Sequence, residues 1–181
     1  TVVGNATQHL YRAYAEAGLN PKKMPIASLT TSEVEVAQMG AQAAAGHFTA
    51  APYFASIDTP ENIRVLERFR ARFGDEVRPN ACWEAAYFQV HMFANALRAT
   101  GTDSIPVLMP QLLGAEFLAP QGRVRIEPSN HHTHVYPRIG RVNSKGDFTI
   151  VRASNNAIAP DPYLVTHSLG DWTLALEALA D

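Results

Sequence analysis

Hydroxyl side chains follow the first apolar strand expected in this sequence. Thr30, Thr31 and Ser32 come directly after the apolar stretch 25–29, and Ser32 begins a helix through a Ser-x-x-Glu capping box that ends at Glu35. Hydroxyls and free backbone N–H groups at such a strand–loop–helix junction suit a carbonyl oxygen of a ligand. The same residue types are the usual helix caps. Ligand binding and plain capping are therefore both open at this loop.

An aromatic pair follows the second expected strand. Tyr53 and Phe54 lie just after Pro52, in the loop 52–58. Their rings could wall an apolar pocket, with the tyrosine hydroxyl as a polar handle. Pro52 stiffens the exit from the strand, so a hinge or packing role is an equal alternative.

The three histidines of the His-His-Thr-His segment, His131, His132 and His134, form the one histidine cluster in the sequence. A zinc site needs three or four converging ligands, whereas neighbours along a strand point to opposite faces. We expect a surface or hydrogen-bonding role here and no metal site.

Cys82 and Glu84 lie at the start of a long expected helix. A thiolate could be stabilised there, but cysteine is among the most often buried residue types. We expect a buried packing role for Cys82, remote from both loops. For Glu84, an exposed or capping carboxylate is the usual case and a buried acid is the alternative.

Composition and motifs exclude several functions. The 181 residues are 46% hydrophobic and 18% charged, with a net charge of −2. This is an ordinary globular composition without the basic excess of a nucleic-acid-binding protein. No apolar run reaches the roughly 20 residues needed to cross a bilayer. A nucleophile elbow, a phosphate-binding glycine loop and a zinc signature are all missing, so we predict no catalytic residue and no cofactor.

Helix and strand signals alternate through the first hundred residues. Strands are expected at 25–29 and 47–51. Helices are expected at 5–17 with Asn5 as cap, from Ser32 to Gly46, at 60–73 after Thr59, at 81–100 and at 106–113. This order predicts an α/β fold with a mostly parallel sheet covered on both faces. Ligands bind at the carboxyl ends of the strands in such sheets.

The later part of the chain has a different pattern. Val124 and Ile126 alternate with arginines, and a hairpin is expected from strands at 138–142 and 148–151 around the turn 143–146. A short helix is expected near Trp172. For the helix 81–100, a repeat of about 3.5 residues predicts the buried face, formed by Trp83, Tyr87, Val90, Phe93 and Leu97.

Several segments in series resemble one known family. They are Ile26–Glu33 (IASLTTSE), Ala51–Pro60 (APYFASIDTP), Trp83–Tyr87 (WEAAY), Ala119–Arg125 (APQGRVR) and Ala159–Tyr163 (APDPY). Together they cover residues 1 to 172 and resemble the carboxyl half of type I periplasmic-binding-protein-like receptors. Within that family, the chain looks closest to the amide-sensing negative regulators of the aliphatic amidase operon. Urea-binding subunits of ABC transporters come second.

The resemblance implies two Rossmann-like, three-layer α/β/α lobes that close on a ligand. Residues 1–51 would be part of the second lobe and 52–127 the back half of the first. Residues 128–151 would return to the second lobe, and 152–181 would form a tail. The amino-terminal half would be absent from this fragment. The expected ligand-binding residues are Ser28, Thr30, Thr31, Ser32, Tyr53 and Phe54.

The resemblance also implies a function. Amino-acid receptors of this fold place a carboxylate in the loop where this chain has Thr30 and Thr31, and a neutral amide or urea needs no such charge. An amide sensor would control amidase expression in the cytoplasm through an antiterminator-type partner. The alternative is a periplasmic substrate-binding component that docks on an ABC permease and carries urea, amides or branched-chain amino acids.

Two readings from other classes also stay open: a hydrolase acting on the same amide, and a protein-interaction module without a small ligand. An isolated half receptor should expose apolar surface. We therefore expect it to aggregate, to pair with its other half or to form a homo-oligomer.

Overall fold

The structure is a computed structural model that describes residues 2–162 and 168–177. Its helices are α1 (Asn5–Glu16), α2 (Glu33–Met39), α3 (Ala41–Ala44), α4 (Pro60–Phe73), α5 (Ala81–Thr100), α6 (Ile105–Leu112) and α7 (Leu169–Glu177). Its strands are β1 (Ala27–Ser28), β2 (Phe48–Ala51), β3 (Glu116–Ala119), β4 (Gly122–Ile126), β5 (Thr133–His134), β6 (Arg138–Val142) and β7 (Phe148–Ala153).

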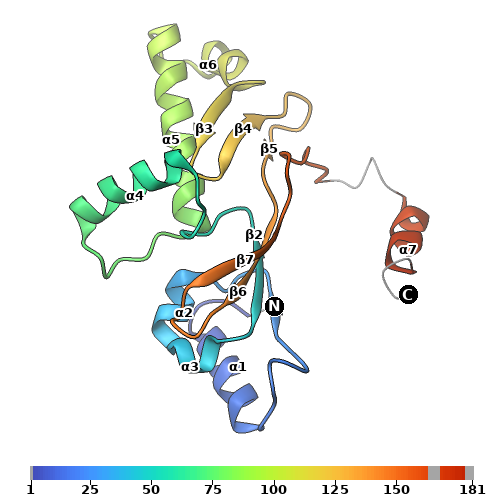
Figure 1. The fold of residues 1–181 in the computed structure, drawn as a ribbon. Helices are drawn as coiled ribbons and strands as arrows, with labels where there is room; N and C mark the ends of the chain where they lie inside the picture. Colours follow the sequence, from blue (N-terminus) through green and yellow to red (C-terminus); the bar gives the residue numbers. More distant parts are fainter. Residues whose placement is uncertain (1, 163–167, 178–181) are drawn as a thin grey trace.

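Two sheets divide these elements into a lower and an upper unit in Figure 1. The lower unit, residues 2–51 and 138–153, has the strand order β1-β2-β6-β7. Helices α2 and α3 pack on one face of this sheet through a core of Val36, Ala44, Phe54, Val142 and Phe148. The core therefore joins the amino-terminal helices to a hairpin that lies a hundred residues later in the chain.

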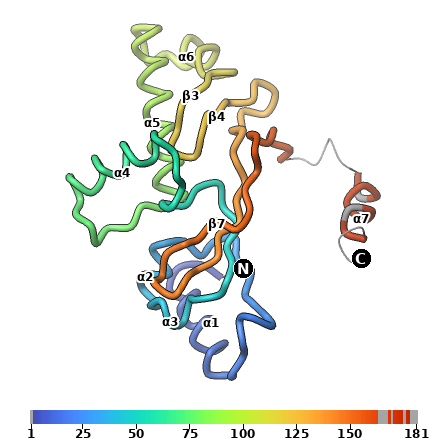
Figure 2. Tube along the Cα trace, in the orientation of Figure 1, coloured from blue at the N-terminus to red at the C-terminus, as the bar shows by residue number. Residues whose placement is uncertain are grey.

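The upper unit, residues 60–134, has the strand order β3-β4-β5. Helix α5 covers this sheet with Phe88 and Met92 against Ala119 and Val124. The chain passes between the two units through residues 52–59, again through 135–137, and a third time after β7, as the trace in Figure 2 shows. The third passage is tied to the second by a bridge between Val135 and Ile158. The described residues thus form a mixed α/β fold with three connections between its units.

Local sequence signals explain where most elements begin and end. The capping box at Ser32 is formed, and Glu35 accepts a hydrogen bond from the Ser32 backbone N–H at 2.8 Å. Thr59 caps α4, with Pro60 in the first turn. The hairpin of β6 and β7 pairs Val142 with Phe148 around the expected turn. These predictions are confirmed.

The prediction of a mostly parallel sheet is wrong for the described residues. Only β1 and β2 run parallel, whereas β2–β6, β6–β7 and both pairs of the upper sheet are antiparallel. Only β1 and β2 are successive strands linked by a helical crossover within one sheet, which a parallel pair requires. The upper sheet is built from short connections, and these produce antiparallel pairs.

Two helix boundaries also differ from expectation. Gly4, not Asn5, occupies the cap position of α1, and no side chain caps that end. The helix expected from Ser32 to Gly46 is interrupted at Gly40, whose φ of 86° lies outside the helical region.

The buried face of α5 was predicted wrongly. The buried residues are Glu84, Phe88, Met92 and Ala96. Val90 and Phe93 are exposed by 67% and 46%. The upper sheet contacts only one stripe of this helix, and apolar residues flank that stripe on both sides, so the apolar repeat alone selected the wrong one. Within residues 2–162 and 168–177, no helix combines the length and apolar character that a membrane span requires.

Gly140 on β6 faces two buried aromatic rings, Phe54 and Phe148. A Cβ at this position would lie 2.8 Å from Cζ of Phe54 and 2.9 Å from Cδ1 of Phe148. We expect Gly140→Ala to lower the free energy of unfolding by about 1–3 kcal/mol through overpacking, as measured by denaturant titration. Gly170→Ala, whose nearest neighbour outside its own helix would be 3.6 Å away, is the control and should not destabilise. Equal stability of both variants would contradict this packing.

Candidate functional site

A cavity of about 290 Å³ lies at the carboxyl ends of β1 and β2. The predicted binding residues that line it are Thr30, Thr31, Ser32, Tyr53 and Phe54. Ser28 does not line it. Val3 and Gly4 contribute from the amino terminus, and Asn80, Ala81 and Cys82 contribute from the start of α5 in the upper unit. The cavity therefore lies between the two units.

The hydroxyl loop after β1 is held together by its own hydrogen bonds. The Ser28 hydroxyl accepts from the backbone N–H of Thr30 at 3.1 Å and of Thr31 at 3.0 Å. The Thr31 hydroxyl donates to Ser28 Oγ at 2.9 Å and lies 3.2 Å from the hydroxyl of the buried Tyr11. Ser28 thus positions the two threonines, and Thr30 and Thr31 present their surfaces to the cavity.

Ser32 connects the two units at this site. Its Oγ accepts a 3.1 Å hydrogen bond from Nδ2 of Asn80. Asn80 also caps α5, because its Oδ1 accepts from the Trp83 backbone N–H at 3.0 Å. Two helix starts therefore meet at one side of the cavity.

The aromatic wall is buried and fixed. Tyr53 and Phe54 are 0% and 1% exposed. The Tyr53 hydroxyl donates to Oδ1 of Asn62 at 2.9 Å, and Nδ2 of Asn62 donates to the carbonyl oxygen of Ile57 at 2.7 Å. Burial raises the pKa of Tyr53 further above its usual range, so the phenol stays neutral. Its ring serves as apolar wall while its hydroxyl holds the loop.

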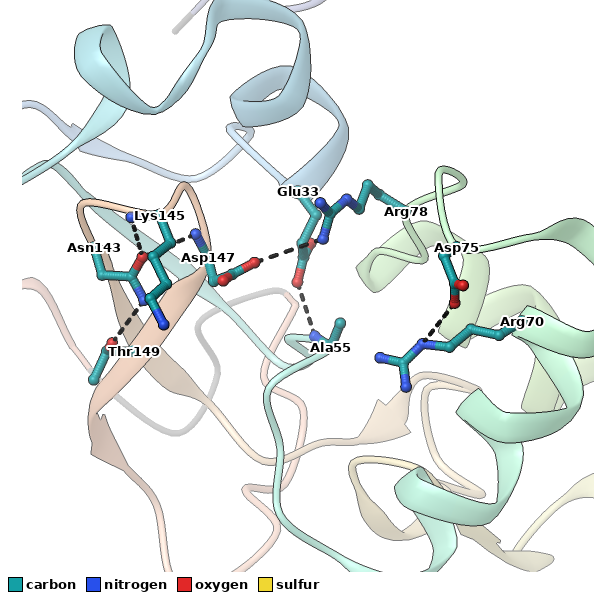
Figure 3. Close-up of polar contacts among 9 residues, drawn as sticks. All are labelled: Glu33, Ala55, Arg70, Asp75, Arg78, Asn143, Lys145, Asp147 and Thr149. Atoms are coloured by element: carbon teal, nitrogen blue, oxygen red, sulfur yellow. Dashed lines mark hydrogen bonds and ion pairs between the residues drawn. The ribbon is translucent and has the colours of Figure 1, made fainter.

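Glu33 lines the cavity and was not among the predicted site residues. It begins α2, as expected, but its side chain is only 9% exposed. Figure 3 shows its carboxylate directed at Ala55, whose backbone N–H donates to Oε1 at 2.8 Å. Burial raises the pKa of Glu33 to about 7. The cavity thus contains a carboxyl group that is partly protonated at neutral pH and bonded to the first passage between the units.

Figure 3 also shows an ion pair between the units beside Glu33. Arg78, before α5, lies 3.6 Å from Asp147 in the β6–β7 turn. Both side chains are about half exposed, so this pair adds little stability and is screened by salt. Asn143 shapes the turn by accepting from the backbone N–H groups of Lys145 and Asp147.

Cys82 is exposed and lines the same cavity. The expectation of a buried cysteine remote from both loops is wrong. The reason is a tertiary contact, since the start of α5 is brought against the β1 and β2 loops by the fold. The sequence carried no local signal for this.

A buried polar network joins the passages between the units. Glu84 is 0% exposed, so the expectation of an exposed or capping residue is wrong. Its carboxylate accepts hydrogen bonds from Nε2 of Gln121 at 2.8 Å and from the Gln121 backbone N–H at 3.3 Å. Arg138 donates to the carbonyl oxygens of Pro52, Tyr136 and Gln121 at 2.6–2.9 Å. Burial raises the pKa of Glu84 to about 7 and lowers that of Arg138.

The histidine cluster makes a local contact. His134 Nε2 lies 2.9 Å from Oε2 of Glu127, and this hydrogen bond lowers the pKa of Glu127. The predicted hydrogen-bonding role is confirmed for His134. Among the described residues, no group of three or more His, Cys, Asp and Glu side chains is placed to hold a metal ion.

A family model described as the periplasmic binding protein domain matches residues 1–169. The match spans most of the 181 residues. The chain belongs to the periplasmic binding protein domain family. Its two sheets and their helices match the type I periplasmic binding protein fold.

Curated relatives of this periplasmic binding protein domain are distant. Limonene hydroxylase of Geobacillus stearothermophilus is 29% identical over 150 residues, which are 79% of this chain and 27% of that protein. Leu/Ile/Val-binding protein homolog 6 of Brucella melitensis biotype 1 is 26% identical over 71% of this chain and 34% of that protein. The chain therefore spans about a third of the length of these relatives.

Solved structures show the same fold. An amino acid ABC transporter substrate-binding protein from Pseudomonas fluorescens Pf-5 aligns with a TM-score of 0.76 at 16% identity, over 93% of this chain and 46% of that one. A solute-binding protein of an ABC transporter from Rhodopseudomonas palustris HaA2, in complex with p-hydroxybenzoic acid, aligns with a TM-score of 0.76 at 22% identity. The alignment covers 91% of this chain and 46% of that one. The chain thus spans about half of each structure, and none of the four relatives named here is an amide receptor.

Proposed function

We propose that this domain is part of a substrate-binding component of an ABC transporter that closes around a small, uncharged polar compound. The observation that carries the proposal is the cavity between the two units, which combines hydroxyls with aromatic rings and has no lysine or arginine in its wall. Concave, largely apolar sites with a few placed polar groups are typical of small-molecule receptors.

The charge of the wall indicates the ligand chemistry. Its ionisable side chains in the described residues include Glu33 and Glu35, and Glu35 is engaged in the Ser32 capping box. A ligand carboxylate placed here would meet no cation and would repel Glu33. A carboxamide or hydroxyl would find donors and acceptors at Thr30 and Thr31. We therefore propose a short aliphatic amide or urea as the first candidate, with branched-chain amino acids as the alternative.

The family relationship favours transport over regulation. The named relatives include amino-acid and aromatic-acid receptors of ABC transporters, whereas the amide-sensing regulator had only the sequence resemblance to support it. In the transport proposal, the protein lies in the periplasm and its closed form docks on a permease. The protein binds its ligand without catalysis.

The proposed movement uses the three passages between the units. Residues 1–51 and 128–151 would belong to one lobe of the complete receptor and 52–127 to the other. A ligand that contacts both lobes stabilises the closed state by its higher affinity for that state. The cavity fits this role because Thr30 and Asn80 line it from opposite units.

A thermal-shift experiment on the intact protein tests this proposal. The panel is acetamide, butyramide, urea, leucine, benzoate and 4-hydroxybenzoate. We expect the melting temperature to rise with increasing concentration of an uncharged compound and to stay constant with benzoate, because stabilisation follows occupancy of the folded state. A constant melting temperature with every compound would remove the proposed ligand class.

A further inference from the structure

Two buried hydroxyls lack a hydrogen-bond partner among the described residues, Oγ1 of Thr7 and Oγ1 of Thr49. The two residues are 0% and 3% exposed. Leaving a buried polar group unpaired costs about 1–3 kcal/mol, so native proteins keep few of them. Of these two threonines, only Thr49 lines the cavity.

The neighbouring strands do not satisfy the Thr49 hydroxyl. On β1 its partner is Ser28, whose hydroxyl is already bonded to Thr30 and Thr31. On β6 its partner is Gly140, which has no side chain. The cavity is therefore the side from which a partner for this hydroxyl can come.

The position of Thr49 within β2 places it deeper than the predicted loop residues. It precedes the last residue of the strand, Ala51, by two positions and shares a face with it, because side chains alternate along a strand. Ala51 also lines the cavity. Tyr53 and Phe54 follow after the strand ends. The hydroxyl thus lies at the inner end of the cavity, beyond the loops.

We infer that Thr49 is a specificity-determining residue whose hydroxyl hydrogen-bonds an uncharged polar group of the bound ligand. The inference rests on the proposed function and deepens it. A hydroxyl both donates and accepts, so it suits a carboxamide or a ligand hydroxyl. A ligand that lacks such a group would leave Thr49 unpaired and bind more weakly.

The test is calorimetric titration of the intact protein with two matched pairs of compounds. Butyramide is compared with 2-pentanone, in which a methyl group replaces the amide nitrogen, and 4-hydroxybenzoate is compared with benzoate. We expect Thr49→Val to weaken binding of the preferred member of a pair by about three- to tenfold, the range for one neutral hydrogen bond. The affinity ratio within that pair should fall by the same factor, and Thr49→Ser should retain it.

Thr7→Val is the matched control, because it removes the other unpaired buried hydroxyl without touching the cavity. It should leave both the affinity and the ratio unchanged. If Thr49→Val binds as Thr7→Val does, with the ratio intact, the inference is overturned while the proposed function stands. If wild-type protein binds none of the four compounds, nor any amide or urea of the thermal-shift panel, the proposed function and the inference both fall.

Discussion

Replacing Glu84 by alanine is expected to lower the free energy of unfolding by about 3 kcal/mol, because it removes the centre of a buried network. Gln121 donates to this carboxylate through both its backbone N–H and its side chain. Both donors are buried and would lose their partner. Arg138, also buried, would lose the nearby negative charge. Denaturant titration measures the change.

Glu67→Ala is the control for this prediction, since Glu67 is exposed on α4. It should change the free energy of unfolding by less than about 0.5 kcal/mol. The Glu84 variant should also unfold less cooperatively, because the network ties Pro52, Tyr136 and Gln121 to one another across the passages between the units. A Glu84 variant as stable as the Glu67 variant would contradict a structural role for this network.

The second large effect concerns pH. Burial raises the pKa of Glu33 from 4.5 to about 7. Between these values the folded state holds a proton that the unfolded chain has lost, so the free energy of unfolding falls as pH rises. Glu33 contributes its full stabilisation below pH 4.5 and loses it by the time the pH has passed about 7. The change has an upper limit of about 3 kcal/mol.

Glu33→Gln isolates this contribution. Glutamine keeps an acceptor for the Ala55 backbone N–H and carries no charge at any pH. Unfolding is measured by denaturant titration at pH 5, 6, 7 and 8. The difference in stability between the variant and wild type should grow in favour of the variant as pH rises. Glu84 also has its pKa raised to about 7, but it is present in both proteins and cancels in the difference. A difference that stays constant from pH 5 to pH 8 would show that Glu33 is not buried as described.

The elements that were predictable from the sequence depend on neighbouring residues. Ser32 and Glu35 form their capping box within one helical turn, and the β6–β7 hairpin needs only the turn at Asn143. Such signals are complete within a few residues, so the sequence contains all the information required. The strand directions and the buried stripe of α5 depend on which distant segments pack together. No local pattern fixes those contacts.

The candidate site divides in the same way. The rule that ligands bind at strand ends located the loops at Thr30 and Tyr53, and the structure brings both to one cavity. Cys82 and Asn80 join that cavity from the other unit through tertiary contacts alone. Thr49 did have a signal, because alternation along the strand 47–51 places it on the same face as Ala51. An unpaired hydroxyl, however, can be recognised only when its surroundings are known.

Calorimetric titration of the intact protein with butyramide, comparing wild type with Cys82→Trp, tests the central claim most directly. Cys82 is exposed at the cavity mouth, so an indole there should fill the cavity and leave the fold intact, which a denaturant titration of the variant confirms. We predict saturable binding at one site in wild type and no measurable heat in the variant. Binding of equal strength in both proteins would place the ligand elsewhere, and the absence of binding in wild type would contradict a receptor for short amides.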